Sequence, residues 1–347
     1  MEQLETEGKN VTESVNRQFR LKQRPVGRAS VTDFDYVQAP VPVPGAGEAL
    51  VRVLYLSIDP TNRVWMSDIE QYMPPVAIGE VMRGLGIGRV VTSNSGRWRV
   101  GDTVSGLLGW QDYTLARESD VFSPTSLPND LPVPLPTMLG ACGMTGLTAY
   151  FGLLELGQPK AQETVVISAA AGAVGSIAGQ IAKIKGCRAV GIAGGPEKCR
   201  WLIEELGFDG AVDYKRADWR DALARATPDG VHVNFENVGG EIMDAVMRRM
   251  TLGGRMVLCG LISSYNGDGK ALDDFSPILM RRLSVRGFII LDFMPRWEEG
   301  GSELVRWVGE GKLKYRETIV DGLENAPKAL DGLFEGINIG KLMVKVA

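Results

Sequence analysis

Thr164–Gly175, which reads TVVISAAAGAVG, is the stretch of sequence that decides the fold. Its first half is a β-branched apolar run, which is typical of a buried strand in a parallel sheet. Its second half is a turn of small residues, after which residues 176–185 have helical spacing. Ala170, Gly172 and Gly175 occupy the three positions of the pattern G-x-G-x-x-G, where small residues allow the tight turn, the approach of a pyrophosphate to the backbone and the packing of helix on strand. The stretch therefore predicts a dinucleotide site at the N-terminus of a helix.

Strands and helices alternate on both sides of this turn. We predict strands over residues 164–168, 187–193, 211–214, 231–236 and 254–260, and helices over 144–156, 176–185, 197–206, 219–226 and 242–250. Alternating strands and helices are the pattern of a doubly wound parallel sheet. The fold class is therefore α/β, with a Rossmann sheet.

The N-terminal part of the chain has a different pattern. Short strands punctuated by glycine are predicted at 49–56, 86–91 and 102–107, which indicates a barrel-like β-rich unit. A proline-rich stretch over 124–136 reads as a connector. The last forty residues break the helix–strand alternation, with strands expected at 313–320 and 341–346 around a helix at 326–334, and they can rejoin the β-rich unit.

We therefore expect four parts along the chain. These are a disordered tail over 1–15, a β-rich domain over 16–137, a dinucleotide-binding domain over 138–307, and a segment over 308–347 that returns to the β-rich domain. Two domains are also the natural expectation for 347 residues, which is more than one hydrophobic core usually serves.

Composition excludes several classes of protein. A net charge of −4 gives none of the basic excess that nucleic-acid binding requires. The polar first 25 residues contain no apolar segment of a signal peptide, and no run of 18 apolar residues predicts a membrane span. We expect a cytoplasmic protein whose four cysteines are reduced thiols. With one histidine, His232, and no C-x-x-C pair, we expect no zinc site.

The second predicted strand indicates which dinucleotide is bound. In NAD-specific sites this strand ends in an acidic residue that holds the ribose 2′-hydroxyl. Here it ends at Gly194-Gly195, followed by Lys198, with Lys215 also near in sequence. Small residues leave room for a 2′-phosphate, and a cation can neutralise it. We therefore predict NADPH, with NADH as the alternative.

Several segments carry a family resemblance. They are GMTGLTAYFGLL (143–154), SAAAGAVGSIAGQIAKIKGCRAVGIAG (168–194), ELGFDGAVDYK (205–215), FENVGGEIMDAV (235–246), CGLISSYN (259–266) and NIGKLMVKV (338–346). In this order they resemble the zinc-free medium-chain dehydrogenase/reductase family, in its prostaglandin reductase and alkenal double-bond reductase branch, which includes curcumin-reductase-like members. The resemblance covers residues 17 to 346. It implies a GroES-like catalytic domain beside the Rossmann domain, NADPH as cofactor, and a homodimer.

The resemblance also implies a set of cofactor-binding residues. Those expected at the pyrophosphate are Gly172, Ala173, Val174 and Gly175. Lys198 and Tyr214 are expected at the 2′-phosphate, Asn237 near the nicotinamide ribose, and Asn338 over the cofactor. Those expected along the cofactor are Cys259, Gly260, Leu261, Ser263 and Tyr265, and those expected to contact nicotinamide through their backbone are Phe288, Ile289 and Ile290. One departure is visible: this chain has Asp59-Pro60-Thr61-Asn62-Arg63 where many relatives carry tyrosine or a small residue and then methionine after Asp-Pro.

The implied reaction is reduction of the carbon–carbon double bond of α,β-unsaturated aldehydes and ketones (EC 1.3.1.-). In such a reaction hydride reaches the β-carbon, and a hydrogen-bond donor stabilises charge on the carbonyl oxygen. Tyr265 is the candidate donor, and Tyr72 is a candidate for lining the substrate pocket. The alternatives are an NADPH:quinone oxidoreductase, a zinc-free alcohol dehydrogenase on the same scaffold, and a non-catalytic NADPH-binding protein.

Overall fold

The computed structural model describes residues 15–267, 269 and 274–347. The tail expected over 1–15 lies outside the described residues except for Val15, which begins strand β1. The chain forms two compact units. The α/β unit comprises Gly140–Thr318 and Gly336–Lys341, and the β unit comprises the described residues up to Leu139 together with Ile319–Glu335 and Leu342–Ala347. The sequence predicts boundaries at 137/138 and 307/308, whereas the chain passes from one unit to the other at 139/140, 318/319, 335/336 and 341/342. Residues 308–318 and 336–341 of the predicted returning segment therefore belong to the α/β unit.

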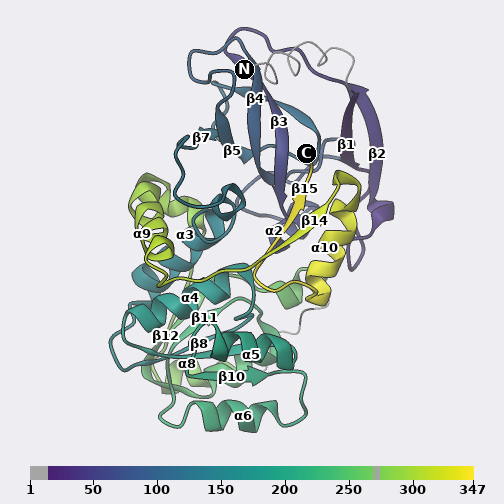
Figure 1. Ribbon diagram of the computed structural model, residues 1–347. Coiled ribbons are helices and arrows are strands. Elements are labelled where there is room, and N and C mark those ends of the chain that lie inside the picture. Colours follow the sequence, from purple (N-terminus) through teal and green to yellow (C-terminus); the bar gives the residue numbers. More distant parts are fainter. Residues whose placement is uncertain (1–14, 268, 270–273) are drawn as a thin grey trace. The chain divides into compact units, whose positions relative to one another are not determined.

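A six-stranded parallel sheet forms the centre of the α/β unit (Figure 1). Its strands are β8 (Thr164–Ile167), β9 (Arg188–Ala193), β10 (Gly210–Asp213), β11 (Val231–Glu236), β12 (Met250–Leu258) and β13 (Ser284–Gly287). Their order is β10-β9-β8-β11-β12-β13, and each neighbouring pair is parallel. This order reverses direction between β8 and β11, which is the switch point where doubly wound sheets bind their ligands. The Rossmann prediction is confirmed.

Strand residues of the α/β unit alternate between two cores. Val165 and Ile167 of β8 are buried in one cluster with α3 and α4, whereas Val166 between them is buried in another with α6 and α7. Both faces of the sheet are therefore covered by helices, as its continuous apolar strands require. The helices of this unit are α3 (Met144–Phe151), α4 (Ala173–Ile184), α5 (Pro196–Glu204), α6 (Trp219–Ala226), α7 (Gly240–Met247), α8 (Ser276–Met280) and α9 (Trp297–Gly309).

Two predicted helices differ from the structure. The helix expected over 144–156 changes at Gly152 into a π-helix, Gly152–Gly157, where a Cβ on Gly152 would lie 2.5 Å from the Phe288 ring. The helix expected over 242–250 ends at Met247, and Met250 instead begins β12, paired with Val231. The apolar spacing in that stretch suits either a helix or a buried strand, so periodicity alone could not find the boundary.

The β unit contains a larger sheet and a separate hairpin. Its strands are β1 (Val15–Leu21), β2 (Phe34–Pro40), β3 (Glu48–Ser57), β4 (Leu85–Ser93), β5 (Thr103–Leu107), β6 (Tyr113–Arg117), β7 (Thr125–Ser126), β14 (Glu317–Asp321) and β15 (Lys341–Lys345). The larger sheet has the order β14-β15-β3-β4-β5-β7, with β6 also paired to β3, and β1 pairs with β2. This is the GroES-like domain of the predicted fold class.

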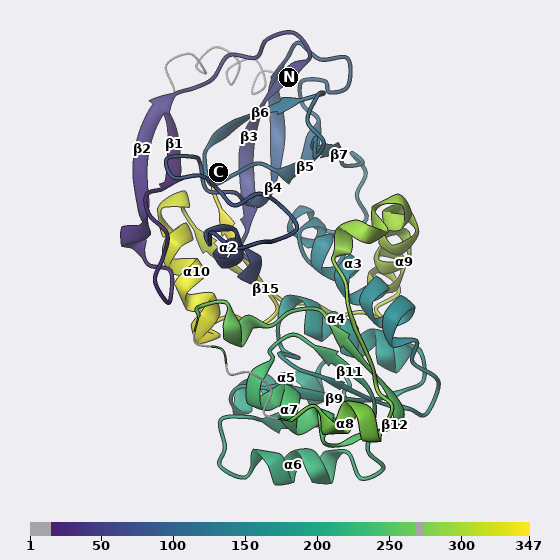
Figure 2. The ribbon, with the colours of Figure 1, turned by 180° about the vertical axis from the view of Figure 1, so that it is seen from behind.

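C-terminal residues complete the β unit. β15 pairs antiparallel with β3 through Met343 and Ser57 (Figure 2). Helix α10 (Ala326–Glu335) packs its apolar face into the same core as α2 (Pro60–Trp65). The unit is thus assembled from segments nearly 300 residues apart in sequence.

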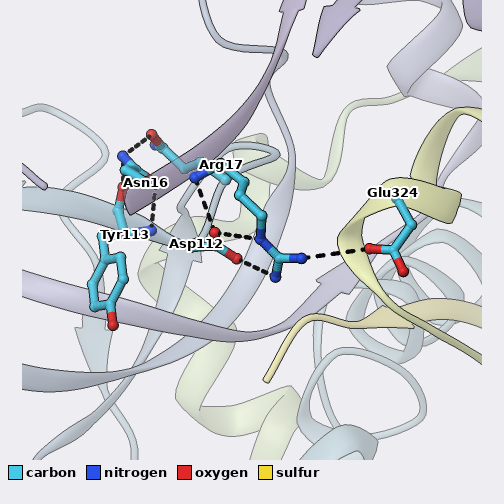
Figure 3. A network of polar contacts seen from close by, with 6 residues as sticks. Asn16, Arg17, Asp112, Tyr113 and Glu324 are labelled. Atoms are coloured by element: carbon cyan, nitrogen blue, oxygen red, sulfur yellow. Dashed lines mark hydrogen bonds and ion pairs between the residues drawn. The ribbon is translucent and has the colours of Figure 1, made fainter. Parts of the chain in front are cut away.

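A polar network ties the N-terminal strand β1 to this unit (Figure 3). The Arg17 guanidinium donates from Nε and Nη2 to the two carboxylate oxygens of Asp112, at 2.8 and 2.9 Å, and its Nη1 lies 3.6 Å from a Glu324 oxygen. Next to it, Asn16 donates to the Tyr113 carbonyl and accepts from the Tyr113 N–H, both at 2.9 Å. The bidentate geometry fixes the direction of β1 relative to β6, which begins at Tyr113 directly after Asp112.

Candidate cofactor site and active site

The turn after β8 is tight and leads directly into helix α4. A Cβ on Gly172 would lie 3.1 Å from the Ala169 carbonyl oxygen, and one on Gly175 would lie 2.5 Å from it. Ala169 takes a positive φ of 47°, and helix α4 begins directly after Gly172. Glycine at these two positions thus lets α4 begin close against the Ala169 backbone, and the N–H groups at a helix start favour binding of an anion.

Ala170, which replaces the first glycine of the pattern, is accommodated by the neighbouring strand. Its side chain is fully buried. A Cβ on Gly191 of β9 would lie 2.8 Å from the Ala170 Cβ. Because Gly191 has no side chain, the Ala170 methyl group fits between the two strands.

Residues from the C-terminal segment lie against this turn within the α/β unit. The Gly340 N–H donates to the Ala171 carbonyl at 2.8 Å, and Gly340 forms a parallel bridge with Gly172. Asn338, which is buried, donates from Nδ2 to the Gly340 carbonyl at 2.8 Å. The structure therefore brings Asn338 and the dinucleotide turn together, although 166 positions separate Asn338 from Gly172.

Two lysines and a tyrosine gather where β9 and β10 end. A Cβ on Gly194 would lie 3.0 Å from the Tyr214 ring and 3.0 Å from the Lys215 Cε. Lys198 of α5 donates from Nζ to the Gly336 carbonyl at 2.6 Å. Burial lowers the pKa of Lys198, and repulsion from Lys215 lowers it further. Two mutually repelling cations beside a glycine loop fit the 2′-phosphate of NADPH. The sequence shows Lys215 near this strand, but the ligands it predicts for the 2′-phosphate are Lys198 and Tyr214.

Glu236, at the end of β11, joins three loops of the site. Its Oε1 accepts the Ser168 hydroxyl at 2.7 Å and the N–H groups of Val238 and Gly239 at 2.7 and 2.8 Å, and its Oε2 accepts Asn234 Nδ2 at 3.0 Å. The side chain is completely buried, and this burial raises the pKa of Glu236. Sequence reasoning did not select this residue, although an acidic residue at the end of a strand predicted to be buried was a visible signal.

Asn237 is fixed by the same network. Its N–H donates to Ser168 Oγ, and its Nδ2 donates to the Ser168 carbonyl, both at 2.7 Å. Asn237 therefore bridges the ends of β11 and β8 at the switch point of the sheet. Ser263 lies close by, donating its hydroxyl proton to the Val238 carbonyl at 2.6 Å, and a Cβ on Gly239 would lie 3.3 Å from its Oγ.

A pocket of about 470 Å³ lies in the α/β unit after β12 and β13. Its lining includes the predicted residues Cys259, Gly260, Leu261, Tyr265, Phe288 and Ile289. The Tyr265 phenol oxygen accepts the Leu261 N–H at 3.1 Å, and a Cβ on Gly260 would lie 3.3 Å from that oxygen. Burial raises the pKa of Cys259 to about 12, so its thiol stays protonated at neutral pH. The pocket is therefore lined by the phenol of Tyr265 and by the uncharged thiol of Cys259.

The backbone of the 288–290 segment is partly engaged within the chain. The Ile289 N–H donates to Asp292 Oδ2 at 3.2 Å, and its carbonyl accepts the Asp292 N–H at 3.0 Å. The Ile290 carbonyl accepts Trp297 Nε1 at 3.2 Å. These bonds fix the segment at the pocket, where Ile289 is extended and Ile290 begins a 3-10 helix over Ile290–Arg296. Asp292, which also lines the pocket, was not among the predicted site residues.

Tyr72 belongs to the β unit and has its own local network. Its hydroxyl accepts Trp65 Nε1 at 3.1 Å and shares a hydrogen bond with Thr61 Oγ1 at 2.7 Å. The side chain is partly exposed, and burial of its phenol raises its pKa. Thr61, at the position where the chain departs from the family pattern, therefore contacts Tyr72 directly. The neighbouring Arg63 is buried and donates to the Gly27 carbonyl, which is a structural role.

The part of the chain that the structure describes has neither a cluster of metal ligands nor a membrane-spanning helix. There, no three histidine, cysteine, aspartate or glutamate side chains gather as metal ligands would. Within the same residues, no helix has the length and apolar character needed to cross a membrane.

Comparison with known proteins gives matches over most of the chain. The family model described as the N-terminal domain of oxidoreductase matches residues 17–123, and that described as zinc-binding dehydrogenase matches 173–307. The NADPH-dependent curcumin reductase of Escherichia coli is 44% identical over 96% of this chain and 97% of its own length. The 2-alkenal reductase of Nicotiana tabacum is 38% identical over 96% of this chain and 98% of its own length. The structure of CurA from Vibrio vulnificus in complex with NADPH is similar, with a TM-score of 0.90, 44% identity and coverage of 95% and 99%.

The fold and the dinucleotide turn define an oxidoreductase with a Rossmann unit and a GroES-like unit. More closely, the chain belongs to the zinc-free reductase branch of the medium-chain dehydrogenase/reductase family, an NADP-dependent branch whose members include proteins named curcumin reductase, prostaglandin reductase and 2-alkenal reductase.

Proposed function

We propose that this chain uses NADPH to reduce the carbon–carbon double bond of α,β-unsaturated aldehydes and ketones. The observation that carries the proposal is the pocket beside Tyr265, which lies at the strand ends of the same unit that contains the dinucleotide turn. The names of the curcumin and 2-alkenal reductases support it, because 2-alkenals and curcumin contain a double bond conjugated to a carbonyl.

We propose a set of residues that would hold NADPH, on the family resemblance and on the turns that carry them. The N–H groups over Gly172–Gly175 would bind the pyrophosphate, and Lys198 and Tyr214 the 2′-phosphate. Asn237 and the segment around Asn338 would contact the nicotinamide half, together with the backbone of 288–290. When bound, NADPH supplies the hydride that reaches the β-carbon of the substrate.

Tyr265 would act on the substrate oxygen. As the β-carbon is reduced, negative charge grows on the carbonyl oxygen of the substrate, and a donor at that oxygen lowers the barrier. The phenol oxygen of Tyr265 accepts the Leu261 N–H and lies at the pocket, which supports this role. We propose that Tyr72 contributes to substrate binding, with its hydroxyl positioned by Trp65 and Thr61.

Three further properties complete the proposal. We propose a reaction that needs no metal, because one histidine and dispersed cysteines give no ligand set for zinc. We propose a homodimer, because β13 is one of the two outer strands of its sheet, all four of its residues are exposed, and α8 just before it exposes Leu279 and Met280. We also propose a cytoplasmic location for the enzyme.

The function is tested by following NADPH consumption with enals, enones, quinones and saturated ketones, and by identifying each product. We expect turnover with enals and enones, and products saturated at the former double bond with the carbonyl retained. Quinone reduction without enone reduction, or an alcohol product, would point to a different oxidoreductase. Tight NADPH binding without turnover of any substrate would point to a non-catalytic protein. Elemental analysis should find no stoichiometric zinc.

A further inference from the structure

Asp213, the last residue of β10, organises the loops on both sides of the proposed 2′-phosphate site. One carboxylate oxygen, Oδ1, accepts the Gly195 N–H at 2.8 Å and the Lys215 N–H at 3.0 Å. Gly195 has a φ of 98°, a backbone conformation that only glycine adopts readily. A single oxygen therefore holds the turn after β9 and the turn after β10 in one arrangement.

The side chain of Lys215 lies close to the Gly194–Gly195 turn that Asp213 holds. The Cε of Lys215 would be 3.0 Å from a Cβ on Gly194, so the lysine stem passes directly over the glycine. On Lys198, repulsion from Lys215 has a larger effect than attraction from Glu197. The chain thus holds two cations near each other at a place where an acidic residue would stand in an NAD-specific site. A dianion between them would relieve this repulsion.

We propose that Lys215 is a second cationic ligand of the NADPH 2′-phosphate, and that Asp213 is a positioning residue that holds Lys215 and the Gly194–Gly195 turn in place for it. This inference rests on the proposed use of NADPH. Asp213 differs from a ribose-binding acid in two respects: it ends β10 rather than β9, and its Oδ1 is occupied by two backbone N–H groups.

The test measures binding rather than turnover. Isothermal titration would give the Kd of adenosine 2′,5′-bisphosphate and of 5′-AMP, which differ only in the 2′-phosphate, for the full-length chain and its variants. Lys215→Ala should weaken binding of the bisphosphate about tenfold, as expected for loss of one charge-assisted contact, and leave 5′-AMP unchanged. Lys198→Ala removes the other cation of the site, and its effect on the Kd of the bisphosphate is the reference for the loss of one cation. Lys185→Ala removes an exposed lysine at the opposite end of α4 and should change neither Kd.

Two variants separate positioning by Asp213 from its charge. Asp213→Ala removes the acceptor and should weaken the bisphosphate about tenfold, whereas Asp213→Asn keeps an acceptor oxygen and should bind within about twofold of the unmodified chain. Equal weakening of 5′-AMP by Asp213→Ala, or a loss in Asp213→Asn as large as that in Asp213→Ala, would overturn the positioning role. Lys215 is exposed, so its variant should fold whatever happens at Asp213.

The failure of this inference differs from that of the proposed function. If the unmodified chain prefers the bisphosphate and Lys215→Ala keeps the full preference, the role of Lys215 is wrong while NADPH use stands. If the unmodified chain binds both probes equally, NADPH specificity itself is wrong, and this inference falls with it.

Discussion

At the scale of single residues, Tyr265 has a position that suits action on a substrate oxygen. Its phenol oxygen accepts the Leu261 N–H and lies at the pocket after β12. We predict that Tyr265→Phe lowers kcat with an enone about a hundredfold, because a donor to developing negative charge is lost. The Kd of NADPH should change less than threefold.

Stopped-flow measurement of NADPH oxidation under single-turnover conditions checks this prediction, because it isolates the chemical step. Tyr150→Phe, which removes the phenolic hydroxyl of a tyrosine in α3, is the matched control and should react at the normal rate. An unchanged rate in Tyr265→Phe would mean that Tyr265 only packs against its neighbours, and that another group stabilises the substrate oxygen.

Glu236 gives a prediction about stability and pH. Burial raises the pKa of Glu236 in the folded chain above its ordinary value of 4.5. As pH rises above 4.5, the unfolded chain therefore loses this proton before the folded chain does, and the free energy of unfolding falls. We predict that the stability of the unmodified chain, measured relative to Glu236→Gln, decreases as pH rises from 4.5 towards neutrality.

Urea denaturation of both chains at several pH values measures this difference. Glu204→Gln, at an exposed position of α5, is the control and should follow the unmodified chain. A relative stability that increases with pH would show instead that the four hydrogen bonds to Glu236 stabilise its carboxylate more than burial disfavours it.

At the scale of elements, the C-terminal segment contacts the dinucleotide turn through Gly340, which pairs with Ala171 and Gly172. Gly340 has a φ of 71°, and a Cβ there would lie 2.0 Å from the Arg316 carbonyl oxygen. We predict that Gly340→Ala destabilises the chain by about 1–3 kcal/mol, because the backbone must leave this conformation. It should also weaken NADPH binding, since Gly340 is bonded to Ala171 in the turn.

Thermal unfolding monitored by circular dichroism tests this, with Gly301→Ala in α9 as the control. A Cβ on Gly301 meets no atom within 4 Å, so alanine there should stabilise the helix by about 1 kcal/mol. If both variants had the same melting temperature, the segment around Gly340 would be loosely held.

Local patterns explain why much of this arrangement could be predicted from sequence. The β-branched run of β8 and the glycines after it determine both a buried parallel strand and the turn that follows, because each depends on neighbours in sequence. The alternation of strands and helices that predicts the Rossmann fold is also a local pattern. Contacts between distant segments could not be derived in this way: Lys198 to Gly336 and Glu236 to Ser168 depend on which strand ends meet in space.

The candidate site shows the same division. Lys198 was found because it follows a strand that ends in glycine, whereas Asp213 was not, because its role depends on two N–H groups from different turns. Asn338 was placed near the cofactor only by family resemblance. No local pattern indicates that its segment crosses the turn 166 positions earlier.

At the scale of the whole molecule, the exposed edge of the parallel sheet predicts self-association. An outer strand with open backbone groups and exposed apolar neighbours is a surface that soluble proteins normally cover. We predict that size-exclusion chromatography with light scattering gives twice the chain mass of 37.6 kDa.

Because a two-fold interface would use the same α8 surface on both copies, Leu279→Glu together with Met280→Glu should place four like charges in it and shift the mass to that of one chain. Val26→Glu, at the most exposed apolar residue of the β unit, should leave the dimer intact. A dimer that survives the double substitution would mean that another surface joins the copies, whereas a monomeric unmodified chain would contradict the homodimer itself.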